Sequence, residues 1–135
     1  MAATPNYPSK VYLNGEILDA GDAKISVFDR GFIFGDGIYE VMARIGGRFL
    51  YGEAHMERLR TCLHKIDIAF DVDQLEAQIP SLLKASGLQE EDCMLYIQVT
   101  RGVAPRQHAY PKGIQPTAMM YAWPKKLPDI NTTPA

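Results

Sequence analysis

The sequence has few of the residues that bind metals or form disulfides. It contains two cysteines, Cys62 and Cys93, and three histidines. Neither set has the spacing of a zinc or redox site. The cysteines fall in a helical and a strand-like pattern respectively, where they fit small buried residues or free thiols. We therefore expect no metal site and no disulfide framework, and a reducing cytoplasm as the location.

Long apolar runs and a strong charge of one sign are also absent. No segment approaches the length of a membrane-spanning helix, and residues 1–5 lack the basic and apolar regions of a signal peptide. The net charge is only −2, which gives no electrostatic footprint for nucleic acid or an anionic membrane. We expect neither of these as a partner.

What is present is the composition of an ordinary globular domain. The 135 residues are 47% hydrophobic and 22% charged, which fits one folded unit rather than a disordered chain. Two prolines within residues 1–8 predict a flexible arm, and three prolines within 124–135 predict the start of an interdomain linker or a tail. Residues 9–123 are the expected folded domain.

Two glycine-containing turns predict β-hairpins. Asn14-Gly15 separates short apolar runs within Lys10 to Leu18, and Gly46-Gly47 separates residues 38–45 from residues 48–51. Such dipeptides readily adopt the positive φ angles that a type I′ hairpin turn requires. Each turn is therefore expected to join two antiparallel strands.

Two helices are expected between the hairpins and the later strands. Glu53 to Asp67 has apolar residues at helical spacing on one face. Asp73 should begin the second helix, with Glu76 as its capping-box partner and Gly87 just beyond its end. Pro80 lies inside this second run and should interrupt or kink it.

The remaining strand signals complete the predicted fold. Met94 to Thr100 alternates between an apolar and a more polar face, and a last strand is expected at Thr117 to Ala122. The sum is an α+β domain in which two helices pack against one face of an antiparallel sheet.

Three sequence blocks point further. They are D-R-G-F-I-F-G-D-G-I-Y-E (Asp29 to Glu40), E-A-H-M-E-R-L (Glu53 to Leu59) and T-R-G-V-A-P-R-Q-H (Thr100 to His108). In this order and at these separations they resemble the N-terminal half of the class IV, fold-type IV pyridoxal-phosphate (PLP) transaminases, over Val11 to Trp123. The R-x-H ending, Arg106-Gln107-His108, is similar to D-amino-acid transaminases.

This resemblance implies a fold, an activity and a cofactor. The fold would be the small N-terminal domain of the fold-type IV enzymes. The activity would be a PLP-dependent transaminase acting on D-amino acids and 2-oxo acids, assembled as a homodimer. Arg58 would bind the cofactor phosphate, which its forked guanidinium suits. Without the motif, a surface arginine on an amphipathic helix would be the better interpretation.

The resemblance also implies substrate-binding residues. Tyr39, Arg106 and His108 match the residues that hold the substrate α-carboxylate, and in the family this loop reaches into the neighbouring subunit's site. Val41 matches a position that lines the site. Taken alone, Arg106 and His108 would be read as part of a solvated basic loop, and Tyr39 as an ordinary core tyrosine.

Other residues in the blocks suggest structural roles. Asp29, Arg30 and Asp36 are expected to form a network that braces the glycine turns. Glu40 matches a family position lining the site, although it can also be explained as an ion-pair partner of Arg30 or Arg44. The resemblance implies that His55 supports the phosphate-binding arginine, and His64 is expected on a helix surface.

The family's Schiff-base lysine has no counterpart in the sequence. None of the seven lysines lies at its place: Lys10, Lys24, Lys65, Lys84, Lys112, Lys125 and Lys126. The acid that pairs with the pyridine nitrogen also belongs to the family's second domain. We therefore expect no catalytic residue in this chain, no activity and no retained PLP for the chain alone. It would be a truncated form, a proteolytic product or a separately encoded half.

Two alternatives stay open. Within the family, the chain can be interpreted as part of a branched-chain amino-acid transaminase or an aminodeoxychorismate lyase, although the R-x-H loop argues against both. Outside catalysis, it can be interpreted as an α+β interaction domain that has kept the fold without the chemistry.

Overall fold

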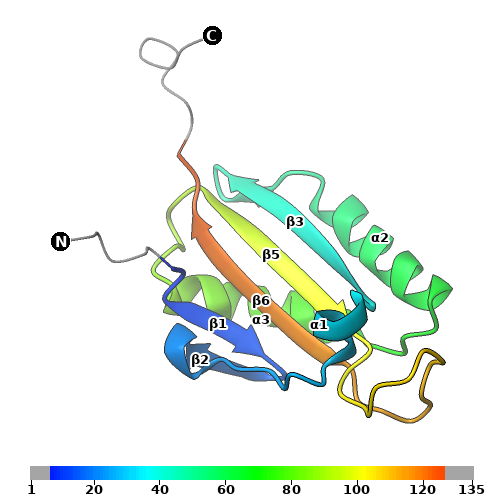
Figure 1. Cartoon of the computed structure of the whole chain (residues 1–135). Helices are drawn as coiled ribbons and strands as arrows, with labels where there is room; N and C mark the ends of the chain where they lie inside the picture. The colour runs from blue at the N-terminus through cyan, green and yellow to red at the C-terminus, as the bar shows by residue number, and fades with distance from the viewer. Residues whose placement is uncertain (1–6, 127–135) are drawn as a thin grey trace, which may run out of the picture.

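The computed structural model describes residues 7–126, so most of the predicted arm and tail lie outside the described residues. Six strands form an antiparallel sheet in the order β2-β1-β6-β5-β3-β4 (Figure 1). The strands are β1 (Lys10–Leu13), β2 (Glu16–Asp19), β3 (Gly37–Ile45), β4 (Arg48–Phe49), β5 (Cys93–Thr100) and β6 (Thr117–Pro124). The helices are α1 (Arg30–Phe34), α2 (Gly52–Lys65) and α3 (Asp73–Ala85), with a short 3-10 turn, η1 (Ala20–Asp22).

Helices α2 and α3 pack against one face of the sheet, with α3 behind the strands and α2 beside β3 in Figure 1. Leu59 of α2 and Leu75 and Leu82 of α3 share one fully buried core with Leu95 and Ile97 of β5. Burying each such side chain contributes about 1.5–3 kcal/mol. The predicted α+β architecture is therefore confirmed. None of the described helices is long and apolar enough to cross a membrane.

Both hairpin predictions are confirmed. Asn14-Gly15 has φ angles of 49° and 96°, and Gly46-Gly47 has φ angles of 58° and 80°. The second hairpin is shorter than predicted, because β4 ends at Phe49. Tyr51 adopts a φ of 53° at the N-cap of α2, so the chain has already turned from strand to helix there.

The predicted beginning of α3 at Asp73 and its end before Gly87 are confirmed, but the predicted capping box and the interruption at Pro80 are not observed. Gly87 has a φ of 70° just beyond the helix. The N-cap is Val72 and makes no side-chain cap, so Asp73 and Glu76 form no capping box. Their carboxylates instead accept hydrogen bonds of 2.6 and 3.2 Å from Arg60. The helix also continues through Pro80, which lies on its exposed side, where water can satisfy the carbonyl that loses its donor.

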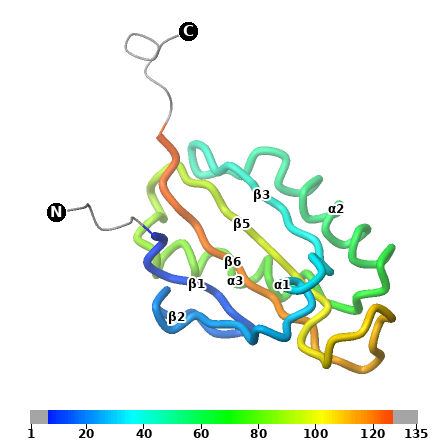
Figure 2. Tube along the Cα trace, in the orientation of Figure 1, coloured from blue at the N-terminus to red at the C-terminus, as the bar shows by residue number. Residues whose placement is uncertain are grey.

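Helix α1 was not predicted, because its five residues are too short to show a periodic pattern. It begins after Asp29, whose Oδ1 accepts a hydrogen bond from the Gly31 amide at 2.8 Å. It ends at Phe34 and is capped by Gly35, which has a φ of 66°. Figure 2 shows α1 at the end of the sheet where β3 begins, beside residues 102–116 of the segment that joins β5 to β6.

The face of the sheet opposite α2 and α3 carries a row of aromatic side chains. Tyr39 stacks on Tyr96 with ring centroids 5.7 Å apart, and Tyr96 stacks on Tyr121 at 5.1 Å. Trp123 continues the row at 5.8 Å from Tyr121. This face is reached by every second residue of β3, β5 and β6 because side chains alternate along a strand. Residues next to one another in β3 therefore face opposite sides.

Candidate functional site

A buried carboxylate on β3 holds two basic side chains of α2. The Glu40 side chain is only 1% exposed. It accepts hydrogen bonds from Arg58 Nε at 2.6 Å and Arg58 Nη2 at 2.7 Å, and it lies 2.8 Å from His55 Nδ1. The Arg58 guanidinium lowers the pKa of Glu40; burial opposes this shift and His55 adds to it. Glu40 therefore pairs with Arg58 and His55, and the interpretation that it pairs with Arg30 or Arg44 is wrong.

The guanidinium of Arg58 is fixed on one side and open on the other. Its side chain is 65% exposed. Glu40 occupies Nε and Nη2, and no residue in the described part of the chain hydrogen-bonds to Nη1. Pairing with Glu40 raises the pKa of Arg58, so the group stays charged. An oriented, permanently charged group of this kind can donate a hydrogen bond to a phosphate oxygen.

Tyr39 and Val41 lie on the opposite face of β3 from Glu40, because they are its neighbours in the strand. Tyr39 is 63% exposed, and Val41 is partly buried. The hydroxyl of Tyr39 is thus placed on a surface rather than in the core. Arg58 meets the same strand from the other face, through Glu40.

Arg106 and His108 lie in the segment 102–116, hereafter the R-x-H loop. Both side chains gather at Phe34 of α1. The Arg106 Cζ is 5.3 Å from the centre of the Phe34 ring, and the His108 ring centre is 5.6 Å from it. Among the described residues, no hydrogen bond joins either side chain to Tyr39. The chain therefore brings Arg106 and His108 together but does not complete the predicted carboxylate site with Tyr39.

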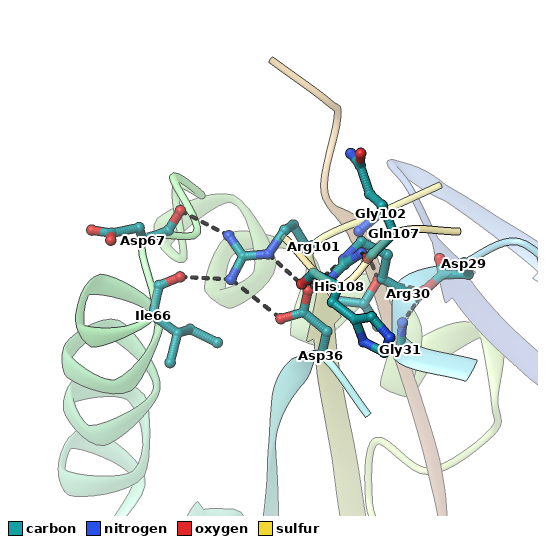
Figure 3. Close-up of polar contacts among 11 residues, drawn as sticks. Asp29, Arg30, Gly31, Asp36, Ile66, Asp67, Arg101, Gly102, Gln107 and His108 are labelled. Atoms are coloured by element: carbon teal, nitrogen blue, oxygen red, sulfur yellow. Dashed lines mark hydrogen bonds and ion pairs between the residues drawn. The ribbon is translucent and has the colours of Figure 1, made fainter. Parts of the chain in front are cut away.

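Asp36 lies between two buried arginines (Figure 3). Its carboxylate accepts a hydrogen bond from Arg30 Nε at 2.7 Å and from Arg101 Nε and Nη2 at 2.8 and 3.2 Å. The side chain of Asp36 is 9% exposed, that of Arg30 is 3% exposed and that of Arg101 is 6% exposed. Burial by itself would raise the pKa of Asp36, but Arg101 and Arg30 outweigh it and lower that pKa.

Besides binding Asp36, the two arginines each donate hydrogen bonds to a different part of the chain. Arg101 donates to the carbonyl oxygens of Ile66 at 2.7 Å and Asp67 at 3.2 Å, at the C-terminal end of α2. A cation at this end of a helix is stabilised by the helix dipole. Arg30 donates to the Gln107 carbonyl of the R-x-H loop at 2.6 Å. The expected structural role of Arg30 and Asp36 is therefore observed.

Arg101 has a larger structural role than the sequence indicated. It belongs to the T-R-G-V-A-P-R-Q-H block, where only Arg106 and His108 had been given roles. Its position directly after a buried strand was the one available signal, since a charged residue at such a strand end is costly to bury without partners. Asp29 completes the structural group, because its Oδ1 also accepts a hydrogen bond from Thr100 Oγ1 at 2.7 Å.

Proteins of similar sequence are D-alanine aminotransferases. The chain is 39% identical over 117 residues to that of Staphylococcus haemolyticus, covering 84% of this chain and 41% of the relative. It is 35% identical over 122 residues to that of Bacillus licheniformis, covering 89% and 42%. The chain thus spans about two fifths of the length of the curated relatives it matches.

Solved structures share the fold. The branched-chain amino acid aminotransferase of Escherichia coli matches with a TM-score of 0.79 at 17% identity, covering 88% of this chain and 40% of that one. The 4-amino-4-deoxychorismate lyase of Pseudomonas aeruginosa matches with a TM-score of 0.68 at 27% identity, covering 86% and 40%. A hypothetical aminotransferase of Mycobacterium tuberculosis in its PLP-bound form matches at 0.70 and 24%, covering 85% and 39%.

The family assignment follows from the sequence itself. Residues 37–134, well over half of the chain, match the model of the amino-transferase class IV family. This range includes β3 with Tyr39 and Glu40, the α2 arginine Arg58, and the R-x-H loop. The chain therefore belongs to the class IV aminotransferase family.

Proposed function

We propose that this chain supplies the phosphate-binding arginine and the substrate-carboxylate residues of a PLP-dependent transaminase acting on D-amino acids and 2-oxo acids. The observation that supports this best is the pairing of exposed Arg58 with buried Glu40, which leaves Nη1 directed to no described partner. The D-alanine aminotransferases at 39% and 35% identity support the substrate class.

Arg58 and its two partners, Glu40 and His55, fit the phosphate group of PLP. The family is PLP-dependent. Arg58 would bind the phosphate, with Glu40 fixing the guanidinium and His55 fixing Glu40 from the other side. When bound, PLP supplies the aldehyde that takes up the amino group and the ring that delocalises electrons from the substrate. The lysine that attaches it would come from the family's second domain.

The substrate carboxylate would be bound by Tyr39, Arg106 and His108. A guanidinium, a phenol and an imidazole can each donate to a carboxylate oxygen. Val41, on the same face of β3 as Tyr39, would give the substrate side chain an apolar contact. Orienting the carboxylate fixes which face of the substrate meets the cofactor, which is how such residues contribute to catalysis.

The alternatives have weaker support. The branched-chain enzyme of Escherichia coli shares the fold at 17% identity, and the lyase of Pseudomonas aeruginosa at 27%. Both identities are below those of the D-alanine aminotransferases. No contact among the described residues specifically favours a non-catalytic interaction domain.

The phosphate role can be tested in a protein that combines this chain with the family's lysine-bearing region. Arg58→Ala should raise the Kd for PLP by at least about tenfold, since a charge-assisted contact to the phosphate is lost. Turnover at saturating PLP should fall less. Equilibrium dialysis with PLP absorbance measures the first effect, and steady-state kinetics measures the second.

Arg60→Ala is the matched control for this experiment. Arg60 lies on the same helix but pairs with Asp73 and Glu76. Its loss should leave the Kd for PLP unchanged. If Arg58→Ala retains PLP as tightly as Arg60→Ala does, the assignment of Arg58 to the phosphate is wrong.

A homodimer is the second part of the proposal. Val27, Phe28 and Val103 form an exposed apolar patch, with exposed fractions of 64%, 57% and 45%. They are neighbours in space because Asp29 and Val103 form an antiparallel bridge. Val103 of the patch belongs to the R-x-H loop, which in a two-subunit site would extend toward the second copy. Exposed apolar groups of this kind favour association.

Phe28→Asp should convert a self-associating chain into a monomer, because a charge in an apolar contact must be desolvated without a partner. Light scattering of the 135-residue chain measures the mass directly. Tyr51→Asp provides the control, since Tyr51 is 83% exposed and follows β4 at the other end of β3. A monodisperse monomer before any substitution would refute the patch as a dimer contact.

A further inference from the structure

We infer that helix α1 is the scaffold of the R-x-H loop, with Arg30 fixing the loop backbone and the Phe34 ring orienting the Arg106 and His108 side chains. Arg30 and Phe34 are positioning residues in this assignment, because each would act on the substrate only through the loop. The inference rests on the proposed function for its link to substrate binding. The scaffold itself depends only on contacts within the chain.

The Arg30 side chain binds the main chain of the R-x-H loop. Its Nη1 donates to the Gln107 carbonyl at 2.6 Å, and its Nη2 lies 3.5 Å from the His108 carbonyl oxygen. These carbonyls belong to the last two residues of the R-x-H motif. The Arg30 side chain is 3% exposed, so water does not compete strongly for these bonds. The backbone of the motif is therefore held at the middle of the loop rather than only at its ends.

The Phe34 ring contacts two side chains of the R-x-H loop. Its ring lies within 4.7 Å of Arg30 Cζ and 5.3 Å of Arg106 Cζ. The His108 ring is 5.6 Å away and tilted by 49°. Cations and tilted aromatic rings at such distances are attracted to an aromatic ring. One ring thus lies within 6 Å of both donors of the motif.

The scaffold is itself rigidly attached to the sheet. Asp36 binds the Nε of Arg30 and is held in turn by Arg101. A Cβ added to Gly31 would lie 2.2 Å from the Cγ2 of Thr100, so α1 packs tightly against the end of β5. The loop also begins against α1, since the Arg30 amide donates to the Gly102 carbonyl at 2.8 Å. The loop is exposed, whereas the side chains of Arg30 and Asp36 are only 3% and 9% exposed.

This arrangement has a consequence for binding. The R-x-H loop has exposed residues from Pro105 to Tyr110, and an unsupported loop would have to be ordered when a substrate binds. Ordering residues on binding reduces affinity, whereas a loop already held in place avoids that cost. The α1 scaffold would therefore lower the KM for the carboxylate substrate without contacting it.

Hydrogen exchange in the 135-residue chain tests the scaffold without any ligand. Arg30→Lys keeps a charge beside Asp36 but has one nitrogen, which cannot also reach the Gln107 and His108 carbonyls. Phe34→Leu keeps an apolar side chain and removes the ring, and it serves if Arg30→Lys fails to fold. We expect exchange of the hydrogen-bonded loop amides, those of Gly102 and Ala104, to accelerate by at least about tenfold in either variant, with α3 and β5 unaffected.

Two substitutions control for nonspecific effects. Phe32→Leu changes the same helix at a side chain that is 72% exposed. Arg44→Lys changes another arginine that donates to loop carbonyls, in this case those of Gln89 and Glu91. Neither should alter exchange in the R-x-H loop. Unchanged loop exchange in both Arg30→Lys and Phe34→Leu overturns the inference, as does acceleration spread equally over the whole domain.

Kinetics in a protein that includes the lysine-bearing region tests the link to substrate. Arg30→Lys should raise the KM for the amino acid by at least about tenfold, with a smaller change in kcat and none in the Kd for PLP. Loop-specific exchange without a change in KM would overturn the link to substrate binding. Because the exchange experiment contains no ligand, its result stands apart from any failure of the proposed transaminase function.

Discussion

Asp36→Ala should lower the free energy of unfolding of this chain by about 3–5 kcal/mol, the cost of leaving buried charges without their partner. The substitution would strand both Arg30 and Arg101, whose side chains are 3% and 6% exposed. It would also free α1 and the end of α2, which the two arginines connect. Urea unfolding followed by circular dichroism measures the loss.

The pH dependence of the free energy of unfolding provides a second test of the Asp36 site. The pKa of Asp36 in the folded chain lies below its ordinary value of 3.8. Its stabilising contribution is therefore fully present above the unfolded pKa and is lost as the pH falls through the folded pKa. Glu40 has a lowered pKa and the same sign. Asp36→Asn should flatten the loss of stability below about pH 4.

Asp19→Ala is the control for this prediction. Asp19 pairs with Lys10, but its side chain is 68% exposed, and exposed ion pairs contribute about 0–1 kcal/mol. If Asp36→Ala proves as mild as Asp19→Ala, the carboxylate between the two arginines is dispensable and the network is not a structural junction.

Arg106→Ala should reduce kcat/KM for the amino acid by at least about one order of magnitude in a protein with the complete site. A hydrogen bond to a charged group contributes roughly 1.5–3 kcal/mol, and His108 would lose the neighbour with which it binds the carboxylate. PLP affinity should be retained, because Arg58 lies on a different element. Steady-state kinetics and PLP dialysis separate the two effects.

Arg48→Ala is the matched control, since Arg48 is an exposed arginine on β4 at the far end of β3. It should change neither quantity. If Arg106→Ala loses PLP while Arg58→Ala keeps it, the two roles are reversed. Equal, mild effects from Arg106, Arg58 and Arg48 would indicate that all three are simply solvated surface arginines.

The sequence by itself determined the features that depend on neighbouring residues. Asn14-Gly15 and Gly46-Gly47 specify their turns because few other dipeptides adopt the required φ angles. The apolar spacing of Glu53 to Asp67 specifies a helix because it presents one face to a core. These are local preferences, and the observed α2 and both hairpins agree with them. The motifs likewise identified the family, since their residues stand at fixed separations in the chain.

Only the tertiary structure decided how the polar side chains are partnered. Glu40 and Arg58 are 18 residues apart, Asp36 and Arg101 are 65 apart, and Arg30 and Gln107 are 77 apart. Arg30, Arg58 and Arg101 have the same side chain, and each binds a carboxylate. Composition alone therefore cannot tell which arginine pairs with which carboxylate. Sheet order and burial decide between them, because a buried carboxylate binds whichever donor the folded backbone brings within reach.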